Sequence, residues 1–214
     1  MLRTSLPDAA AYGVDLMQRQ TLFFDALRQR ANTMLAHERD GMPPVLKFKY
    51  ELVADAATFE PACNYQLLKI LEIGDICLDD CLDPDKPPVI IIDPRAGHGP
   101  GIGGFKDDSE VGIALHEGYP VYFVVFTPDP VSGQTLADVL AGLRQFVELV
   151  AERHDGEAPV LYGNCQGGWA AALLAADCEG LAGPIVMNGS PLSYWAGEPG
   201  ANPMRLAAGF LGGA

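Results

Sequence analysis

The chain has 214 residues, of which 49% are apolar and 20% charged, so it can bury a substantial core as one domain. Lys and Arg number 14 against 28 Asp and Glu, and the net charge of −14 argues against non-specific nucleic-acid binding. It does not exclude an anionic small molecule, because a local site can differ in sign from the whole. We expect no transmembrane segment, since no apolar run approaches the roughly 20 residues that a membrane span needs. Five cysteines in a chain of this size, without an apolar signal sequence, favour a cytoplasmic protein.

The first part of the chain predicts a helix. Apolar residues recur every three or four positions through residues 14–35, and Gly41 with Pro43 and Pro44 ends the pattern. We therefore treat residues 1–44 as an N-terminal amphipathic helical segment. Such a helix packs on its own domain, on a partner protein or in a homo-oligomer.

The next segments change period. Residues 45–53 alternate near period 2, which predicts an exposed or edge strand. Residues 65–73 predict a second strand, although a short helix also fits. The acidic, Pro-rich stretch 75–88 predicts a loop.

From residue 89 onward, short β-branched runs alternate with helical patterns, which is typical of βαβ units in a parallel sheet. Residues 45–214 therefore predict a partial α/β domain, with a doubly wound, mostly parallel sheet and helices on both faces. The expected buried strands are 89–92, 119–126, 159–162 and 184–188, and the expected helices are 107–117, 135–153 and 167–176.

The segment GNCQGGW at 163–169 carries the strongest chemical signal. Cys165 lies between a predicted strand and a predicted helix, with Gly163 and Gly167 two positions to either side. This spacing is that of a nucleophile elbow, whose tight turn excludes larger neighbours. The helix N-terminus favours a thiolate, and the backbone N–H of Gln166 would face a developing oxyanion.

A Gly-rich loop follows the strand at 89–92. Its residues Gly97, His98 and Gly99 are in the right place to give the second oxyanion donor or to contact substrate. The same loop matches a dinucleotide-binding pattern, but no acidic residue closes the next strand about 20 residues on. We expect no metal and no cofactor; the cysteines at 77 and 81 lack a second ligand pair for zinc.

A general base is missing from the expected place. None of the four histidines follows Cys165, although the usual chain order is nucleophile, acid, then histidine. His98 alone is predicted to lie at the end of the sheet where the elbow lies. Either His98 substitutes, or the site is incomplete, or the C-terminal part of the domain lies beyond residue 214, which is the expectation we favour.

Four stretches carry a family resemblance: LFFDALRQR at 22–30, DPRAGHGPGIGGF at 93–105, GNCQGGW, and GSPLSYWAG at 189–197. The chain resembles a bacterial polyhydroxyalkanoate-synthase-like family of unknown function in the α/β-hydrolase superfamily, whose members are longer. The resemblance implies an α/β-hydrolase fold in which Cys165 matches the nucleophile of the related polyester synthases.

In those synthases a cysteine is acylated by a hydroxyacyl-CoA and passes the acyl group to a polymer, so the resemblance implies acyl transfer from a small-molecule thioester or ester through Cys165. The base and the acid would come from the missing part, so the chain as given would be inactive. The alternative is a non-catalytic binding or scaffold protein with the same fold.

Overall fold

The computed structural model describes residues 6–73, 76–77, 82–95 and 101–193. It divides the chain into two compact units, Met1–Pro43 and Pro44–Ala214. Of the sequence features above, the loop residues 96–100, including Gly97, His98 and Gly99, lie outside the described residues, as do Cys81 and the end of the stretch at 189–197.

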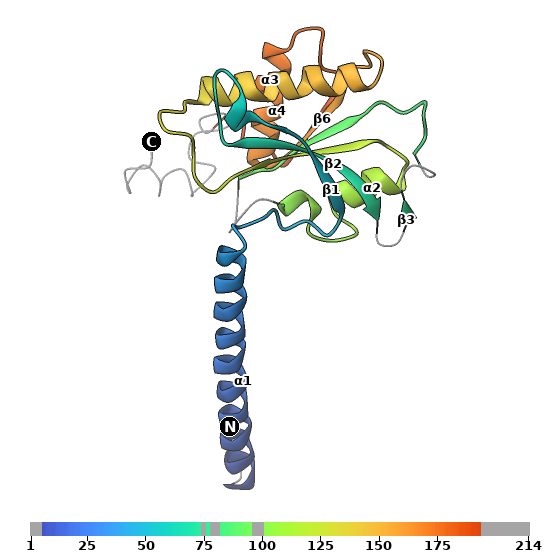
Figure 1. Cartoon of the computed structure of the whole chain (residues 1–214). Helices are drawn as coiled ribbons and strands as arrows, with labels where there is room; N and C mark the ends of the chain where they lie inside the picture. Colours follow the sequence, from blue (N-terminus) through green and yellow to red (C-terminus); the bar gives the residue numbers. More distant parts are fainter. Residues whose placement is uncertain (1–5, 74–75, 78–81, 96–100, 194–214) are drawn as a thin grey trace. The chain divides into compact units, whose positions relative to one another are not determined.

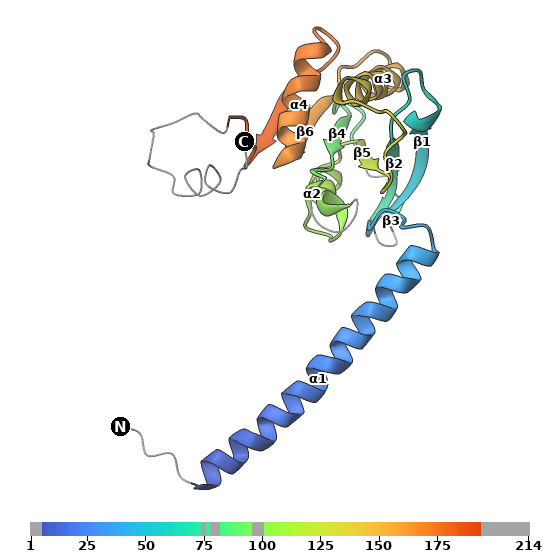
Figure 2. The same cartoon turned by 90° about the vertical axis from the view of Figure 1, so that its left-hand side faces the viewer.

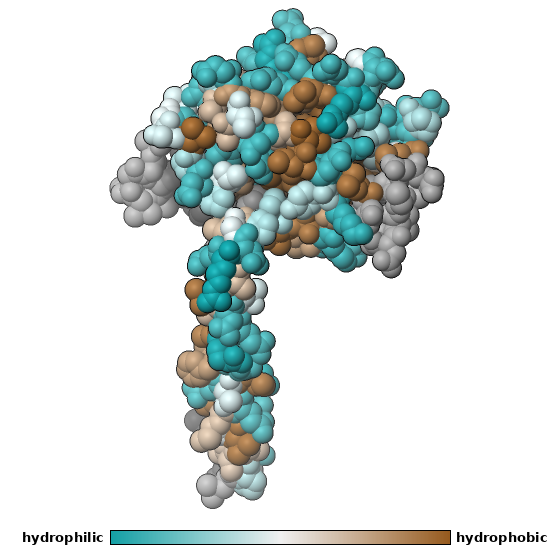
Figure 3. Space-filling view, in the orientation of Figure 1, coloured by the Kyte–Doolittle hydropathy of each residue, from teal (hydrophilic) through white to brown (hydrophobic). Residues whose placement is uncertain are grey.

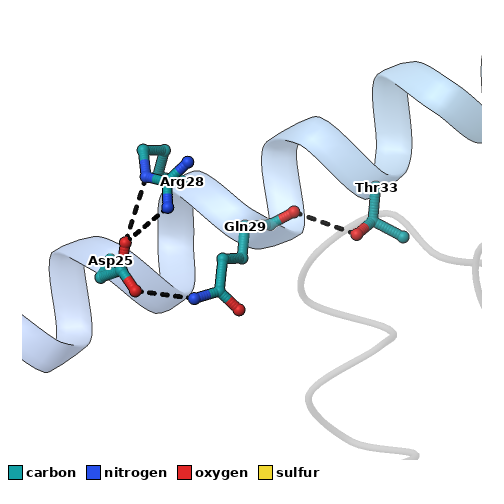
Figure 4. A network of polar contacts seen from close by, with 4 residues as sticks. All are labelled: Asp25, Arg28, Gln29 and Thr33. Carbon is teal, nitrogen blue, oxygen red and sulfur yellow. Dashed lines mark hydrogen bonds and ion pairs between the residues drawn. The ribbon is translucent and has the colours of Figure 1, made fainter.

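The first unit is one helix, α1 (Leu6–Arg39), which includes and extends the helix predicted over 14–35. Side-chain pairs one turn apart stabilise it: Asp25 accepts hydrogen bonds from Arg28 and Gln29, and the Thr33 hydroxyl donates to the Gln29 carbonyl (Figure 4). Large apolar side chains are exposed along this unit (Figure 3). Among the helices that the structure describes, none is both long and apolar enough to cross a membrane.

The second unit is built on one sheet (Figure 1), and the order of its six main strands is β1-β2-β5-β4-β6-β7. β2 pairs antiparallel with β1 and β5, whereas β5, β4, β6 and β7 run parallel. A short strand, β3, pairs with β2. The strands are β1 (Lys49–Asp55), β2 (Tyr65–Ile73), β3 (Ile76–Cys77), β4 (Val89–Ile92), β5 (Val121–Phe126), β6 (Val160–Asn164) and β7 (Ile185–Asn188).

Helices cover both faces of this sheet. α3 (Leu136–Arg153) and α4 (Gln166–Asp177) lie on one face, and α2 (Glu110–His116) lies on the other (Figure 2). Short 3-10 turns, Ala56–Thr58 and Ile102–Gly104, interrupt two of the connections. The mostly parallel sheet with helices on both faces is the α/β-hydrolase-like fold that the sequence predicts.

Successive residues of β5 face opposite sides of the sheet, so they belong to two different apolar clusters. Tyr122 and Val124 belong to the cluster under α3 and α4, whereas Val121 and Phe123 pack with α2 on the opposite face. The core residues of both clusters are almost completely buried, so the helices on both faces pack firmly on the sheet.

Two predictions about the strands were wrong. The loop predicted over 75–88 contains β3, because a few residues pair with the end of β2. The strand predicted as buried over 184–188 is β7, and its residues Ile185 and Met187 are 40% and 39% exposed. β7 pairs with β6 alone among the described strands, and pairing, which the apolar run does not reveal, decides burial.

The α3 side of the core gives a test of the fold. Phe146 is fully buried, and its ring centroid lies 5.7 Å from that of Phe59. We expect Phe146→Ala to lower the free energy of unfolding by about 3–5 kcal/mol, because it removes apolar contact and leaves a cavity. Urea-induced unfolding followed by circular dichroism measures the change.

The matched control is Ile113→Ala on α2, where the side chain is 58% exposed. This variant should change the free energy of unfolding by no more than about 0.5 kcal/mol. Equal effects of the two substitutions would contradict the packing described for α3.

Candidate active site

Cys165 occupies a strained turn between β6 and α4. Its backbone has φ 53° and ψ −122°, a conformation that costs a residue with a side chain roughly 1–3 kcal/mol. Two hydrogen bonds hold the turn: the Cys165 N–H donates to the Asn188 carbonyl of β7 at 2.9 Å, and the Gly168 N–H donates to the Cys165 carbonyl at 3.1 Å. The thiol is partly exposed. This geometry is that of a nucleophile elbow.

The glycines on either side of Cys165 are required because a side chain at either position would collide with neighbouring backbone atoms. A Cβ on Gly163 would lie 2.2 Å from the carbonyl carbon of Gly167, and a Cβ on Gly167 would lie 2.4 Å from the Ile92 carbonyl oxygen of β4. Real Cβ contacts are essentially never below 3.0 Å. The first turn of α4 therefore reaches β6 and β4 closely only because both positions lack a side chain.

The start of α4 offers a donor for an oxyanion. The first N–H groups of a helix have no acceptor within the helix, and the Gln166 N–H has none among the residues that the structure describes. It directly follows the thiol, as the first oxyanion donor of an elbow does. The predicted second donor, from Gly97 to Gly99, falls in the part of the chain left undescribed and stays a prediction.

Asp93 fixes the described ends of that Gly-rich loop. Its carboxylate is buried and accepts hydrogen bonds from the backbone N–H of Arg95 at 3.0 Å and of Gly101 at 2.5 Å. Gly101 has φ +123°, and a Cβ there would lie 2.4 Å from the Val45 carbonyl oxygen. The loop after β4 is therefore held against the sheet on both sides of residues 96–100.

A cavity of about 300 Å³ lies beside the elbow. It is bounded by the end of β4, the start of β2 and the first turns of α3 and α4, and its wall is mostly apolar. The lining residues are Tyr65, Ile92, Asp93, Pro94, Arg95, Gln134, Thr135, Leu136, Val139, Leu140, Leu143, Gln166, Trp169, Ala170 and Leu173.

An amide pair, in which Asn64 is buried and Gln134 is partly buried, holds one wall of this cavity. The Gln134 side chain accepts from the Asn64 N–H at 2.9 Å and donates to the Asn64 side-chain oxygen at 2.7 Å. Asn64 in turn donates to the Thr127 carbonyl at 2.6 Å. These bonds connect the starts of β2 and α3 to the end of β5, so the cavity is preformed.

The two described histidines of this unit lie away from Cys165. His116 ends α2, and His154 follows α3, where its Nε2 lies 3.0 Å from the Tyr122 hydroxyl near the start of β5. Burial lowers the pKa of His154. Both histidines therefore lie toward the amino ends of the parallel strands, whereas Cys165 follows the carboxyl end of β6. His98 lies outside the described residues.

The sequence patterns did not identify Asp93, Arg95 or Trp169 as residues of the site. Asp93 and Arg95 directly follow β4, and ligands of parallel sheets bind at the carboxyl ends of strands. Their position after the β-branched run was the signal that could have identified them. Trp169 faces the cavity because it lies one helical turn after Cys165, on the first turns of α4.

The chain is similar to known proteins over almost its whole length. Residues 15–214 match the model of a family described as a protein of unknown function, DUF3141. The chain belongs to this family. It is 45% identical over 212 residues to an uncharacterized protein in the ackA 5' region of Rhizobium meliloti, and the match covers 98% of this chain and 28% of that protein.

Solved structures with partial likeness include two hydrolases. An α/β serine hydrolase without a lid from Xanthomonas campestris is 17% identical, with a TM-score of 0.42 and coverage of 72% of this chain and 67% of that one. Esterase B from Lactobacillus rhamnosis is 15% identical, with a TM-score of 0.44 and coverage of 89% and 64%. The fold class follows from the strand order and the helix layers, independently of these likenesses.

Three of the cysteines differ in exposure in a way that alkylation can measure. Burial raises the pKa of the Cys63 and Cys178 thiols and removes both from solvent, whereas Cys165 is partly exposed. We expect iodoacetamide at neutral pH to modify Cys165 several-fold faster than either, because the reagent reaches a partly exposed thiol more readily than a buried one. Peptide mass spectrometry of the native protein measures each rate.

Unfolded protein supplies the control, because denaturation should bring the three rates together. If Cys165 reacts as slowly as Cys178 in the native protein, the thiol is not presented at the turn.

Proposed function

We propose that Cys165 is the nucleophile of an acyl-transfer or hydrolysis reaction on a small ester or thioester. The thiolate sulfur forms a bond to the substrate carbonyl carbon, and the carbonyl oxygen becomes an oxyanion. When the tetrahedral species collapses, the carbon–oxygen or carbon–sulfur bond to the leaving group breaks, and the leaving group takes up a proton. Water or a hydroxyl group then takes the acyl group from sulfur.

One observation carries this proposal: the strained backbone of Cys165 at the start of α4. A lone structural cysteine needs neither a φ of 53° nor glycines whose absent side chains let α4 approach β4. The Gln166 N–H next to the thiol has no acceptor among the described residues, and it supports the same assignment because it is a donor positioned before the charge develops.

The finer part of the proposal is the acceptor. The resemblance to polyester synthases favours a hydroxyacyl thioester as donor and a hydroxyl group as acceptor. A thioester suits a cysteine nucleophile because thiolate and thioester exchange readily, and the acyl group stays activated on sulfur.

A proton acceptor completes the reaction, and we propose two sources for it. His98 is one, in the loop after β4. The other is a residue of a longer protein, since the chain spans 28% of the length of the curated relative that it matches. The two are separable, because His98→Gln abolishes turnover only in the first case.

The test is capture of the acyl group on Cys165. The full-length protein is mixed with butyryl-CoA and with p-nitrophenyl butyrate, quenched in acid, digested and examined by peptide mass spectrometry. We expect the acyl mass on the peptide containing Cys165, and Cys165→Ala should abolish both the adduct and p-nitrophenol release.

Cys178→Ala is the matched control, because it removes the thiol at the carboxyl end of α4. This variant should still form the acyl adduct on Cys165. If the full-length protein forms no adduct at Cys165 with either substrate, the proposal is wrong. The binding or scaffold function then takes its place. One observation supports that alternative, namely the exposed apolar side chains of α1, which suit a partner or a second copy of the chain.

A further inference from the structure

Arg95 introduces a positive charge into the cavity beside the elbow. It is the first described side chain after Pro94 at the carboxyl end of β4, and its backbone has φ 51°. Its N–H donates to the buried Asp93 carboxylate, which also accepts from Gly101. The Asp93 carboxylate thus accepts two bonds from the loop backbone, and Asp93 and Arg95 both line the cavity.

Two aromatic rings hold the guanidinium in place. The Arg95 Cζ lies 4.7 Å from the Phe126 ring centroid and 5.5 Å from the Tyr65 ring centroid. Its Nη1 donates to the Tyr65 hydroxyl at 3.3 Å. Stacking on two rings orients the planar group and reduces the entropy that it loses when it binds a ligand.

The guanidinium keeps donors for a ligand. It carries five N–H groups, of which one donates to Tyr65. Within the described part of the chain, no ion pair joins Arg95 to a carboxylate. Burial raises the pKa of the Tyr65 hydroxyl, so this group stays protonated at neutral pH and can also donate.

Apart from Arg95, Asp93 and a few polar side chains, the wall of the cavity is apolar. Leu136, Leu140, Trp169 and Leu173 line it, and Gln166, the residue after the thiol, lines it as well. At about 300 Å³ it is at the small end of ligand pockets, which run roughly from 300 to 1,000 Å³. Arg95 and the residue after the thiol therefore line the same cavity. Because the chain has a net charge of −14, the attraction of an anion to this cavity has to come from the local positive charge of Arg95.

We infer that the substrate of the proposed reaction carries, beside a short apolar chain, a carboxylate or phosphate that binds to Arg95. Only the claim that the bound molecule is a substrate rests on the proposed function; the binding of an anion to Arg95 does not depend on it. A planar guanidinium with two adjacent free N–H groups matches the paired oxygens of either anion. The anion belongs either to the acyl group, as a carboxylate, or to the carrier of the acyl group, as a phosphate.

Binding to the full-length Cys165→Ala protein tests this inference without turnover. Isothermal titration compares hexanoate with hexanamide, and hexyl phosphate with hexanol, because each pair has the same chain with and without the charge. We expect at least one anion to bind about tenfold or more tightly than its neutral partner, in line with a hydrogen bond to a charged group. The pair with the larger ratio identifies the source of the anion.

Arg95→Met should remove this preference, and Arg95→Lys should keep part of it, because lysine retains the charge without the planar fork. The matched control is Arg144→Met on α3, where the arginine pairs with Glu148 at the surface, and it should keep the full preference. Thermal unfolding of each variant checks that it folds. Should Arg95→Met fail to fold, the Arg95→Lys variant and the weakening of hexanoate binding by added salt still test the charge.

Equal affinity for anions and neutral partners in the protein that retains Arg95 would overturn the inference. So would a preference that survives in a folded Arg95→Met protein. The outcomes separate it from the proposed function: anion binding without an acyl adduct at Cys165 contradicts the function alone. An adduct without any preference for anions contradicts this inference alone.

Discussion

The close approach of α4 to two strands is the constraint on which the site depends. Gly163 and Gly167 leave no room for a Cβ, and the contact between them is backbone against backbone. This contact forces Cys165 into a left-handed conformation, and the hydrogen bond from its N–H to Asn188 ties the turn to β7. The sheet core on both faces supplies the stability that offsets this strain.

The same contact determines what surrounds the thiol. Because Gly167 touches the Ile92 carbonyl, the end of β4 and the loop that follows it lie next to the first turn of α4. Asp93 then fixes that loop through two backbone N–H groups, and Arg95 turns its side chain into the cavity. The strained turn at Cys165 and the Arg95 side chain in the cavity therefore both lie where one helix packs unusually close to one strand.

Local sequence signals predicted what is local in the structure. The unbroken β-branched run of β4 indicated a buried parallel strand, and Thr135 caps α3 at the place where the predicted helix begins. The tight turn at Cys165 was predictable for the same reason, since its steric requirement for glycine acts over five residues, whereas the role of Cys165 as a nucleophile stays a proposal.

What required distant residues was not predicted. Arg95 and Tyr65 are 30 positions apart in the sequence, and they come together only because β2 pairs antiparallel with β5. The amide pair between Asn64 and Gln134 spans 70 positions. The exposure of β7 was missed because an apolar run reveals the preference of a strand, whereas its burial depends on which elements lie beside it.

The most direct measurement of the central claim is a crystal structure of the full-length protein treated with a trifluoromethyl ketone that carries a short alkyl chain. The claim predicts a bond from Cys165 Sγ to the ketone carbon, with the resulting oxyanion roughly 2.7–3.1 Å from the Gln166 nitrogen. The alkyl chain should enter the cavity between α3 and α4. A ketone that leaves Cys165 unmodified, or an oxyanion directed away from Gln166, would contradict the assignment of this turn as a nucleophile elbow.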